Sequence, residues 1–382
     1  SRHNQGSGAR GIPSRVFISY WLSDYSAEFQ VAEKIEMNTI FAKDVLIEQD
    51  ETHKRKLGVR FVYDVKADER GNITRFKARL VVQGFDMISM LHYDETYAPV
   101  AREATIKWVI VFAMKRNYHM ACADFKGAFL NSDVPDKFEI VIRCPPGVSV
   151  PKGKELRLRK ALYGCKNSGY LWFEDLKKLL LELGFVVSEF DPCLFIYQRK
   201  EDRMYVVTWV DDIIAATNNQ DLWEKQILPK IKQKGFELSS VGELEWFLGL
   251  KIEIVESNEH GNRIVKFSQT QYIRDLLKKF DMESAKGKSV PIRPEDLLLH
   301  TDMPDEYMKM EDGTKLKAKN PVWLHENDDC EFPVRELIGA LYHLARWSCP
   351  QISFAVNHVA QFQSKSKIKV WPLCKNILAH LK

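Results

Sequence analysis

The chain has 382 residues, of which 45% are hydrophobic and 11% are aromatic, so it can bury a large core divided between two or three subdomains. Lysine and arginine exceed aspartate and glutamate by 56 to 52, and this formal net charge of +4 permits a polyanionic partner without requiring one. Seven scattered cysteines argue against a disulfide framework and a zinc site, and no apolar run approaches the roughly 20 residues that span a bilayer, which argues against a membrane partner.

The first part of the chain, residues 1–55, gives no readable function. Its polar start lacks the apolar segment of a signal peptide, and its first residue is Ser rather than Met. We therefore expect an intracellular protein with reduced thiols that is a fragment or a processed piece of a longer one. Loose apolar spacing over residues 27–41 favours a helix.

A β-hairpin is predicted next. The strand-like runs VRFVYDVK and ITRFKARLVVQGF flank the turn signal DERGN, and basic residues, including Lys77 and Arg79, fall on one face. A helix is expected over residues 104–116, because apolar residues recur there at helical spacing. The short strand-like run HMACADF follows, and it places Asp124 at a strand end.

The middle of the chain predicts a helix followed by a second hairpin. Residues 128–151 are predicted to be irregular, whereas residues 156–183 are predicted to be mostly helical with a break near Ser168. The runs CLFIYQ and MYVVTWV are joined by the charged turn RKEDR. They predict a hairpin whose second strand runs directly into Asp211 and Asp212, at its tip.

The last third of the chain is predicted to be mainly helical. We expect an amphipathic helix over residues 219–234, a hairpin from GELEWFLGLKIEIV to Lys266, and a helix over residues 269–280. A polar, acidic stretch over residues 295–329 is typical of a linker, and helical material resumes after it. The main boundary is therefore predicted near Pro294.

Three carboxylates could meet at one edge of a sheet, because Asp124 ends one strand and Asp211 with Asp212 ends another. Mg²⁺ takes oxygen ligands and keeps part of its water. Two such ions, about 3.5–4 Å apart, could activate a 3′-hydroxyl and hold a triphosphate for in-line phosphoryl transfer. The alternative interpretation of an Asp-Asp pair after a strand is a solvated hairpin tip.

Two neighbouring features favour convergence of the three acids. Phe129 follows Asp124 in DFKGAFLN, where an aromatic ring can lie against the sugar of an incoming nucleotide and exclude a 2′-hydroxyl. The run MYVVTWV before the acid pair is apolar enough to be a buried strand that fixes the carboxylates. The alternative for Phe129 is an ordinary core ring.

Ordered motifs connect the chain to a known family. DFKGAFLN, KALYGCKNSGYLWF and TWVDDIIAA resemble, in order and separation, successive palm motifs of the reverse transcriptases of copia-type LTR retrotransposons. FKARLVVQGF and HYDETYAPVAR are similar to the upstream segments of that family. GELEWFLGLKI and FSQTQYIRDLLKKF look like its thumb, and ELIGALYHLARWSCPQISFAVN looks like its connection towards RNase H. The resemblance begins near Val59 and continues to the last residue.

The resemblance implies an α+β protein with the right-hand polymerase fold of fingers, palm and thumb, an antiparallel palm sheet and a partial connection segment. The implied divisions are an N-terminal extension of unassigned role (residues 1–55), fingers and palm (56–240), thumb (241–294), and a linker with a connection segment (295–382). The chain stops where the RNase H domain of the family would begin, so we expect that activity to be missing here.

The resemblance also implies site residues. Asp124, Asp211 and Asp212 would be catalytic acids that bind two Mg²⁺ ions, or Mn²⁺, and the carbonyl of Phe125 would be a further metal ligand. The implied nucleotide-binding residues are Lys77, Arg79, Phe129, Asn167, Ser168 and Gly169. For Lys77 and Arg79 the alternative is a solvated face of the hairpin.

Four other side chains have weaker assignments. In polymerases generally, a lysine beyond the acid pair can protonate the leaving pyrophosphate, which makes Lys234, or else Lys232, the candidate general acid. The alternative is a solvated helix end. Trp172 is a candidate for stacking on a template–primer duplex, with a core position as the alternative, and Trp246 is expected in the core.

The sequence departs from the family pattern at three places. Trp209 stands where the family has Tyr, and Gln83 stands in VVQGF where the family has Arg. KNSGYLW replaces a pattern of Gln, a small residue, Pro and Arg, which puts template positioning by residues 167–170 in question. Each change removes a polar or cationic contact to a polyanion, and such contacts contribute about 1–3 kcal/mol apiece.

The main functional prediction is an RNA-directed DNA polymerase, with DNA as the alternative template. Its expected partners are a primed RNA or DNA template, deoxynucleoside triphosphates and other parts of a retrotransposon polyprotein. Its expected location is a cytoplasmic virus-like particle, with the nucleus as the alternative. The second hypothesis is a catalytically weakened nucleic-acid-binding or interaction protein derived from such an element. A primase- or nuclease-like two-metal enzyme of another fold would need its acids in another order.

Overall fold

The computed structural model describes residues 24–52, 54–67, 73–256, 263–298, 307–309, 315–317, 332–364 and 367–382. These residues form two compact units that divide the chain between Leu244 and Glu245. The helices and strands of the first unit are α1 (Ser26–Ala42), β1 (Leu46–Asp50), β2 (Val59–Ala67), β3 (Ile73–Val82), α2 (Glu103–Lys115), β4 (His119–Phe125), β5 (Val141–Ile142), β6 (Lys154–Leu158), α3 (Ser168–Glu182), β7 (Val186–Val187), β8 (Leu194–Arg199), β9 (Asp202–Trp209), β10 (Asp212–Thr217), α4 (Leu228–Gln233) and β11 (Leu238–Glu243).

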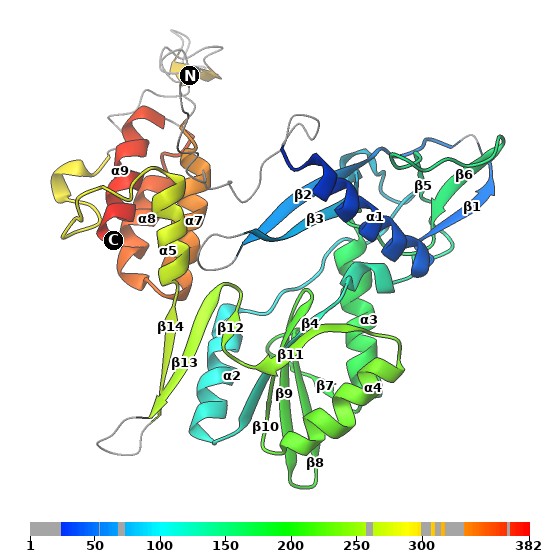
Figure 1. Ribbon diagram of the computed structural model, residues 1–382. Coiled ribbons are helices and arrows are strands. Elements are labelled where there is room, and N and C mark those ends of the chain that lie inside the picture. The colour runs from blue at the N-terminus through cyan, green and yellow to red at the C-terminus, as the bar shows by residue number, and fades with distance from the viewer. Residues whose placement is uncertain are drawn as a thin grey trace, which may run out of the picture. The chain divides into compact units, whose positions relative to one another are not determined.

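A six-stranded antiparallel sheet is the centre of the first unit, with strand order β11-β4-β10-β9-β8-β7. Alternate residues of β4 face opposite sides, so Ala121, Ala123 and Phe125 enter the core beneath α3 and α4. The helix α2 packs against β4, β9 and β10 (Figure 1). The α+β class and the antiparallel palm sheet implied by the family resemblance are thereby confirmed.

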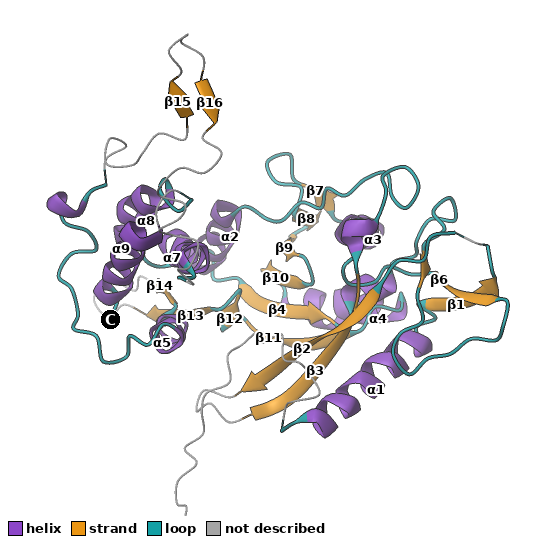
Figure 2. Ribbon diagram, turned by 90° about the horizontal axis from the view of Figure 1, so that it is seen from above, coloured by secondary structure: helices purple, strands orange, loops and turns teal. Residues whose placement is uncertain are grey.

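The hairpin β2–β3 belongs to a second core of the same unit. Leu57, Leu80 and Val82 are buried there with the small sheet β1-β6-β5. The helix α1 runs beside β3 (Figure 2), and the rings of Phe29 and Phe76 meet edge to face with centroids 5.1 Å apart. The N-terminal segment thus contributes a helix that supports the hairpin.

Two glycines allow the end of β3 to dock on the turn before α3. The amide N–H of Val82 donates to the carbonyl of Tyr163 at 2.8 Å. A Cβ on Gly84 would lie 1.9 Å from the carbonyl oxygen of Gly164, and Gly164 itself has φ of +89°. Only glycine fits this close approach and this left-handed backbone, so the Gly84–Gly164 joint fixes the hairpin relative to the sheet.

Glu155 anchors the strand pair β1–β6. Its buried Oε1 accepts hydrogen bonds from Thr52 Oγ1 at 2.6 Å and Gln49 Nε2 at 3.0 Å, and Lys56 Nζ lies 3.4 Å from Oε2. Burial acts to raise the pKa of Glu155, but these hydrogen bonds outweigh it and lower the pKa to about 2.

Replacing Glu155 with glutamine is expected to lower the free energy of unfolding of the first unit by about 1–3 kcal/mol at pH 7. The folded pKa lies below the ordinary value of 4.5, so the stabilisation is present above pH 4.5 and is lost as pH falls towards 2. Chemical denaturation of both proteins over this pH range measures the difference. Glu48→Gln, at an exposed position of β1, is the control, and an equal effect of both substitutions would contradict the anchoring role.

The second unit combines a three-stranded sheet with a helical core. Its elements are β12 (Trp246–Phe247), β13 (Leu250–Glu256), β14 (Arg263–Ser268), α5 (Thr270–Lys279), β15 (Tyr307–Lys309), β16 (Lys315–Lys317), α7 (Val334–Trp347), α8 (Ser353–Ala360) and α9 (Lys367–His380). Leu276 and Leu277 of α5 share one buried cluster with Leu341, Val356 and Ile377 of the later helices. Segments on both sides of Pro294 therefore contribute to one core, while the division into thumb and connection stays a prediction.

Most of the predicted elements are confirmed, including the helices over residues 27–41, 104–116 and 269–280 and both predicted hairpins of the first unit. The prediction of helix from residue 156 was wrong, because KELRL alternates polar and apolar residues and pairs as β6 with β1. The helix α3 begins only at Ser168, where a break was expected. The predicted linker, residues 295–329, lies mostly outside the described residues.

Two palm strands, β10 and β11, were not predicted at all. Trp246, expected in the core, is 46% exposed. Within the described ranges, no helix has both the length and the apolar character needed to cross a membrane.

Candidate active site

The strand register brings the three predicted acids to one end of the six-stranded sheet. Asp212 is the first residue of β10, and it faces Asp124 of β4 on one side and Trp209 of β9 on the other. Asp211 lies in the turn between β9 and β10, and its carbonyl accepts a hydrogen bond from the N–H of Phe125 at 2.9 Å. The acid pair therefore lies where the turn after β9 leads into β10, next to Asp124 of β4.

The acids act on one another electrostatically. Burial raises the pKa of Asp212 to about 6, and the charges of Asp211 and Asp124 act in the same direction. Burial also raises the pKa of Asp211, as does the charge of Asp124, whereas Arg79 and Lys77 lower it. Arg79 and Lys77 of the hairpin thus act electrostatically on Asp211, and their assignment to nucleotide binding stays a prediction.

Ser239 contacts Asp124 from a bulge in β11. The register of β11 on β4 shifts between Leu238 and Ser240, and the hydroxyl of Ser239 donates to the Oδ2 atom of Asp124. Bulges of this kind re-aim a side chain at the edge of a sheet. Ser239 was not predicted as a site residue, because the polar run LSSVGE does not show the alternation that marks a strand.

Tyr163 joins the predicted residues of the hairpin and the palm. The guanidinium carbon of Arg79 lies 5.7 Å from the centroid of the Tyr163 ring, and the half-buried ring of Phe129 packs against the same ring edge to face at 5.4 Å. Burial raises the pKa of Tyr163, and the charge of Asp211 adds to the rise. Tyr163, which the sequence analysis left unassigned, thus contacts both Arg79 and Phe129 and lies close enough to Asp211 for the charge of that acid to act on it.

The helix α1 contributes an acid next to the hairpin cations. Glu36 Oε1 accepts a hydrogen bond from the N–H of Leu80 at 3.2 Å, and burial raises the pKa of Glu36. Burial lowers the pKa of Lys77, and the positive charges of Arg79 and Arg75 lower it further, whereas Glu36 raises it. The positive charges of the hairpin therefore repel one another, and an anion bound beside them would relieve this repulsion.

The segment Asn167, Ser168 and Gly169 begins α3. Asn167 and Ser168 are each 2% exposed, and the hydroxyl of Ser168 donates to the carbonyl of Leu162 at 2.7 Å. A Cβ on Gly169 would lie 3.2 Å from the Cβ of Ala98. The structure therefore covers the side chains of Asn167 and Ser168, and their contact with a nucleotide stays a prediction.

Lys234 ends α4 and forms an exposed ion pair, with its Nζ atom 2.6 Å from Oε2 of Glu182. An exposed pair of this kind contributes little to stability, so it neither fixes Lys234 nor prevents it from moving. The contact gives no support to the general-acid assignment. Lys232, the alternative, is exposed as well.

The donor set at the acids suits hard divalent cations, because three carboxylates on two paired strands and the adjoining turn supply oxygen ligands. The charge of Asp124 raises the pKa of both Asp211 and Asp212. In this structure the three carboxylates do not converge on one metal position. Within the described part of the chain, no three His, Cys, Asp or Glu side chains lie close enough together to hold a metal ion. Like charges repel and Ser239 holds Asp124, so ion binding would have to draw the carboxylates together. The side chain of Phe125 has no oxygen, nitrogen or sulfur atom, so only its backbone carbonyl could be a ligand, and that role stays a prediction.

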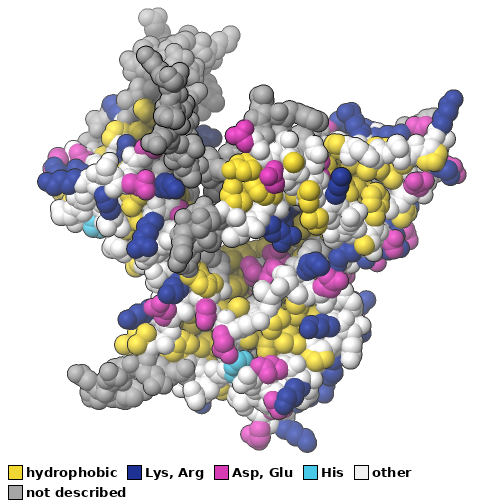
Figure 3. Space-filling model, viewed as in Figure 1, with side chains coloured by type: hydrophobic (Ala, Val, Ile, Leu, Met, Phe, Trp, Pro, Cys, Tyr) yellow, Lys and Arg dark blue, Asp and Glu magenta, His cyan; other side chains and the backbone are white. Residues whose placement is uncertain are grey.

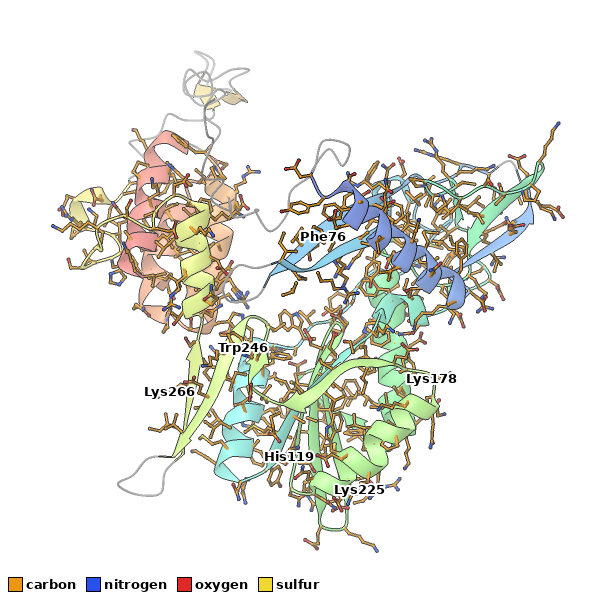
Figure 4. All side chains as sticks on the ribbon, viewed as in Figure 1. Phe76, His119, Lys178, Lys225, Trp246 and Lys266 are labelled. Atoms are coloured by element: carbon orange, nitrogen blue, oxygen red, sulfur yellow. The ribbon has the colours of Figure 1, made fainter. Side chains whose placement is uncertain are left out.

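Figure 3 shows acidic side chains in a recess of the first unit, with Lys and Arg side chains beside them. Figure 4 places Phe76 on the hairpin above this region and His119 at the opposite end of β4 from Asp124. His119 Nδ1 lies 3.7 Å from Oε1 of Glu243, so this histidine belongs to the far end of the sheet.

Comparisons with known proteins show similarity to one family. A family model described as reverse transcriptase (RNA-dependent DNA polymerase) matches residues 45–294. The chain is 31% identical over 339 residues to the retrovirus-related Pol polyprotein from transposon RE1 of Arabidopsis thaliana, covering 88% of this chain and 21% of the relative. It is 26% identical over 336 residues to the Pol polyprotein from transposon TNT 1-94 of Nicotiana tabacum, covering 86% and 23%.

The chain thus spans about a fifth of the length of these curated relatives. Among solved structures, it is similar to the foamy viral protease-reverse transcriptase in complex with double-stranded DNA, with a TM-score of 0.37 and 14% identity. That similarity covers 70% of this chain and 42% of the viral one.

Proposed function

Because this chain belongs to the reverse transcriptase family, as its sequence motifs and its similarity to copia-type retrotransposon polyproteins indicate, we propose that it is an RNA-directed DNA polymerase. Its reaction would add deoxynucleoside triphosphates to the 3′-hydroxyl of a primer on an RNA or DNA template. The proposed setting is a retrotransposon polyprotein in a cytoplasmic virus-like particle, with the nucleus as the alternative.

The observation that carries this proposal is the strand register that pairs Asp124 with Asp212 and holds Asp211 beside Phe125. When bound at these carboxylates, two Mg²⁺ ions, or Mn²⁺, would activate the 3′-hydroxyl and stabilise the charge on the triphosphate. Asp124, Asp211 and Asp212 would hold these ions. Sheet pairing on both sides of β10 supports the backbone of Asp212.

The hairpin and its neighbours would bind the nucleotide. Arg79 and Lys77 act electrostatically on Asp211, so they stand where they can neutralise a triphosphate near the acids. Phe129, packed on Tyr163, is supported at the position where a ring could exclude a 2′-hydroxyl. Lys234 is kept as a candidate proton donor without a contact that favours it.

The test is primer extension on poly(rA)–oligo(dT) with dTTP and Mg²⁺, using the whole chain. Extension that requires the template and stops when a chelator removes Mg²⁺ is the expected result. A folded protein that binds the duplex, measured by fluorescence anisotropy, and yet extends no primer with Mg²⁺ or Mn²⁺ would overturn the proposal.

Replacing Phe129 with valine is expected to increase the use of ribonucleotides relative to deoxyribonucleotides by about 10- to 100-fold, because the smaller side chain opens space for a 2′-hydroxyl. The ratio of kcat/KM for UTP and dTTP measures the change. Phe138→Val, a buried ring of the hairpin core, is the control and should leave the ratio unaltered. An unaltered ratio in Phe129→Val would assign Phe129 to the core alone.

A nucleic-acid-binding protein without polymerase activity is the second candidate. The observation that favours it is the burial of Asn167 and Ser168, in the segment that departs from the family pattern. The duplex-binding measurement separates the two candidates, because only the polymerase couples binding to extension.

A further inference from the structure

The turn that carries the acids has an unfavourable backbone conformation. Val210 joins β9 to Asp211, and its φ of 56° lies in the left-handed region. A β-branched residue rarely adopts this region, because its Cβ approaches the following carbonyl oxygen. Val210 is 37% exposed, so its side chain is only partly packed.

The indole of Trp172 holds the turn from the helix side of the sheet. Its Nε1–H donates to the carbonyl of Val210 at 2.6 Å. Trp172 lies on α3, is 1% exposed, and packs against the ring of Phe125 with centroids 5.1 Å apart. The N–H of Phe125 in turn donates to the carbonyl of Asp211. Two successive carbonyls, those of Val210 and Asp211, are therefore fixed by two residues whose rings touch.

We propose that Trp172 is a positioning residue for the acid pair, which fixes the peptide between Val210 and Asp211 through its indole N–H. Without this bond the strained turn can relax to negative φ, and the relaxation rotates the peptide that directs Asp211 and Asp212. The catalytic part of this inference rests on the proposed function, whereas the hold on the turn does not. Trp172 is buried beneath the sheet, so it acts through the turn and not by stacking on a nucleic acid.

The chain offers a matched control for this inference. Trp223 is also 1% exposed and lies in the same core cluster as Trp172. Its Nε1 has no hydrogen-bond acceptor among the described residues. Trp172→Phe and Trp223→Phe therefore remove similar ring volume from one core, but only the first removes a donor to the acid turn.

The first experiment measures amide hydrogen exchange by mass spectrometry in a peptide that covers residues 204–217. Trp172→Phe is expected to accelerate exchange in this peptide, and Trp223→Phe is expected to leave it near the wild-type rate. Equal exchange in the two variants would overturn the inference, whatever their activity, because the hold on the turn would then be absent.

The second experiment measures extension kinetics for the same variants. Trp172→Phe should lower kcat by about 10- to 100-fold, because the acids are misplaced, while KM for the primed template changes little. Val210→Gly combined with Trp172→Phe should recover part of kcat, since glycine adopts positive φ without strain. An equal loss of kcat in both tryptophan variants would mean that Trp172 contributes only to the packing of the core and does not position the acids. The two hypotheses can also fail separately. If the wild type extends no primer but Trp172→Phe alone accelerates hydrogen exchange, the proposed polymerase activity is rejected, whereas the proposal that Trp172 fixes the turn stands.

Discussion

Asp212→Asn is expected to reduce primer extension by at least about a thousandfold and, at neutral pH without divalent metal, to stabilise the first unit. The activity falls because an amide is a poor ligand for Mg²⁺ and cannot balance its charge. Stability rises because the substitution removes a carboxylate that burial and two neighbouring acids disfavour. The expected gain is about 1–2 kcal/mol, after allowance for screening by solvent at a partly exposed site. Extension assays and denaturation of the same preparations measure both effects.

The pH dependence of this gain has a definite sign. The folded pKa of Asp212, about 6, is raised above the ordinary value of 3.8, so the folded chain binds a proton more readily than the unfolded chain does. The advantage of Asp212→Asn over the wild type should therefore be largest above pH 6. It should shrink as pH falls from 6 to 3.8 and vanish below, where the carboxyl is protonated in both states.

Asp221→Asn is the matched control for Asp212→Asn. Its side chain is 63% exposed and pairs with Lys225 at 2.8 Å, away from the acids. This substitution should change the free energy of unfolding by less than about 0.5 kcal/mol and leave extension intact. At pH 7 the carboxyl of Asp212 is deprotonated in the wild type. If Asp212→Asn destabilises the protein at this pH, the three acids do not form the repulsive cluster that a metal site requires.

How far the sequence predicts this site depends on which feature carries each residue. The sequence predicts Asp124 and Asp211 because each follows an apolar strand-like run. It does not predict that Asp212 begins a strand of its own, and the six residues of β10 show why. DIIAAT is buried on both faces, so it lacks the alternation that marks a strand, and only its pairing with β4 and β9 reveals it. The acids therefore lie within a three-strand arrangement that the local pattern cannot show.

Residues placed by turns and bulges could not be predicted from spacing. Ser239 reaches Asp124 through a register shift, and Tyr163 reaches Arg79 and Phe129 through a turn that ends in a left-handed glycine. The burial of Asn167 has a similar origin. Its position in the family motif suggests contact with a ligand, whereas the packing of the first turn of α3 covers its side chain.

Gly164→Ala is expected to lower the free energy of unfolding of the first unit by about 3 kcal/mol or more. A Cβ at this position would lie 2.2 Å from the carbonyl oxygen of Val82 and 2.6 Å from Cγ1 of Val81, on a backbone with φ of +89°. Relief of the contact requires the end of β3 to move away, which breaks the hydrogen bond from Val82 N–H to the carbonyl of Tyr163. Thermal and chemical denaturation measure the loss.

Gly147→Ala separates the clash from the backbone strain. Gly147 has φ of +79°, yet no atom lies within 4 Å of an added Cβ, so this substitution carries only the left-handed penalty of about 1–2 kcal/mol. The difference in free energy of unfolding between the two variants measures the contribution of the Gly84–Gly164 joint itself.

Because Arg79 lies on the hairpin and Asp211 on the sheet, the joint also sets the separation between the cations and the acids. Gly164→Ala should therefore lower kcat/KM for dTTP even at temperatures where the variant stays folded, and Gly147→Ala should not. Equal destabilisation by both alanines would mean that the hairpin is held to the sheet by other contacts.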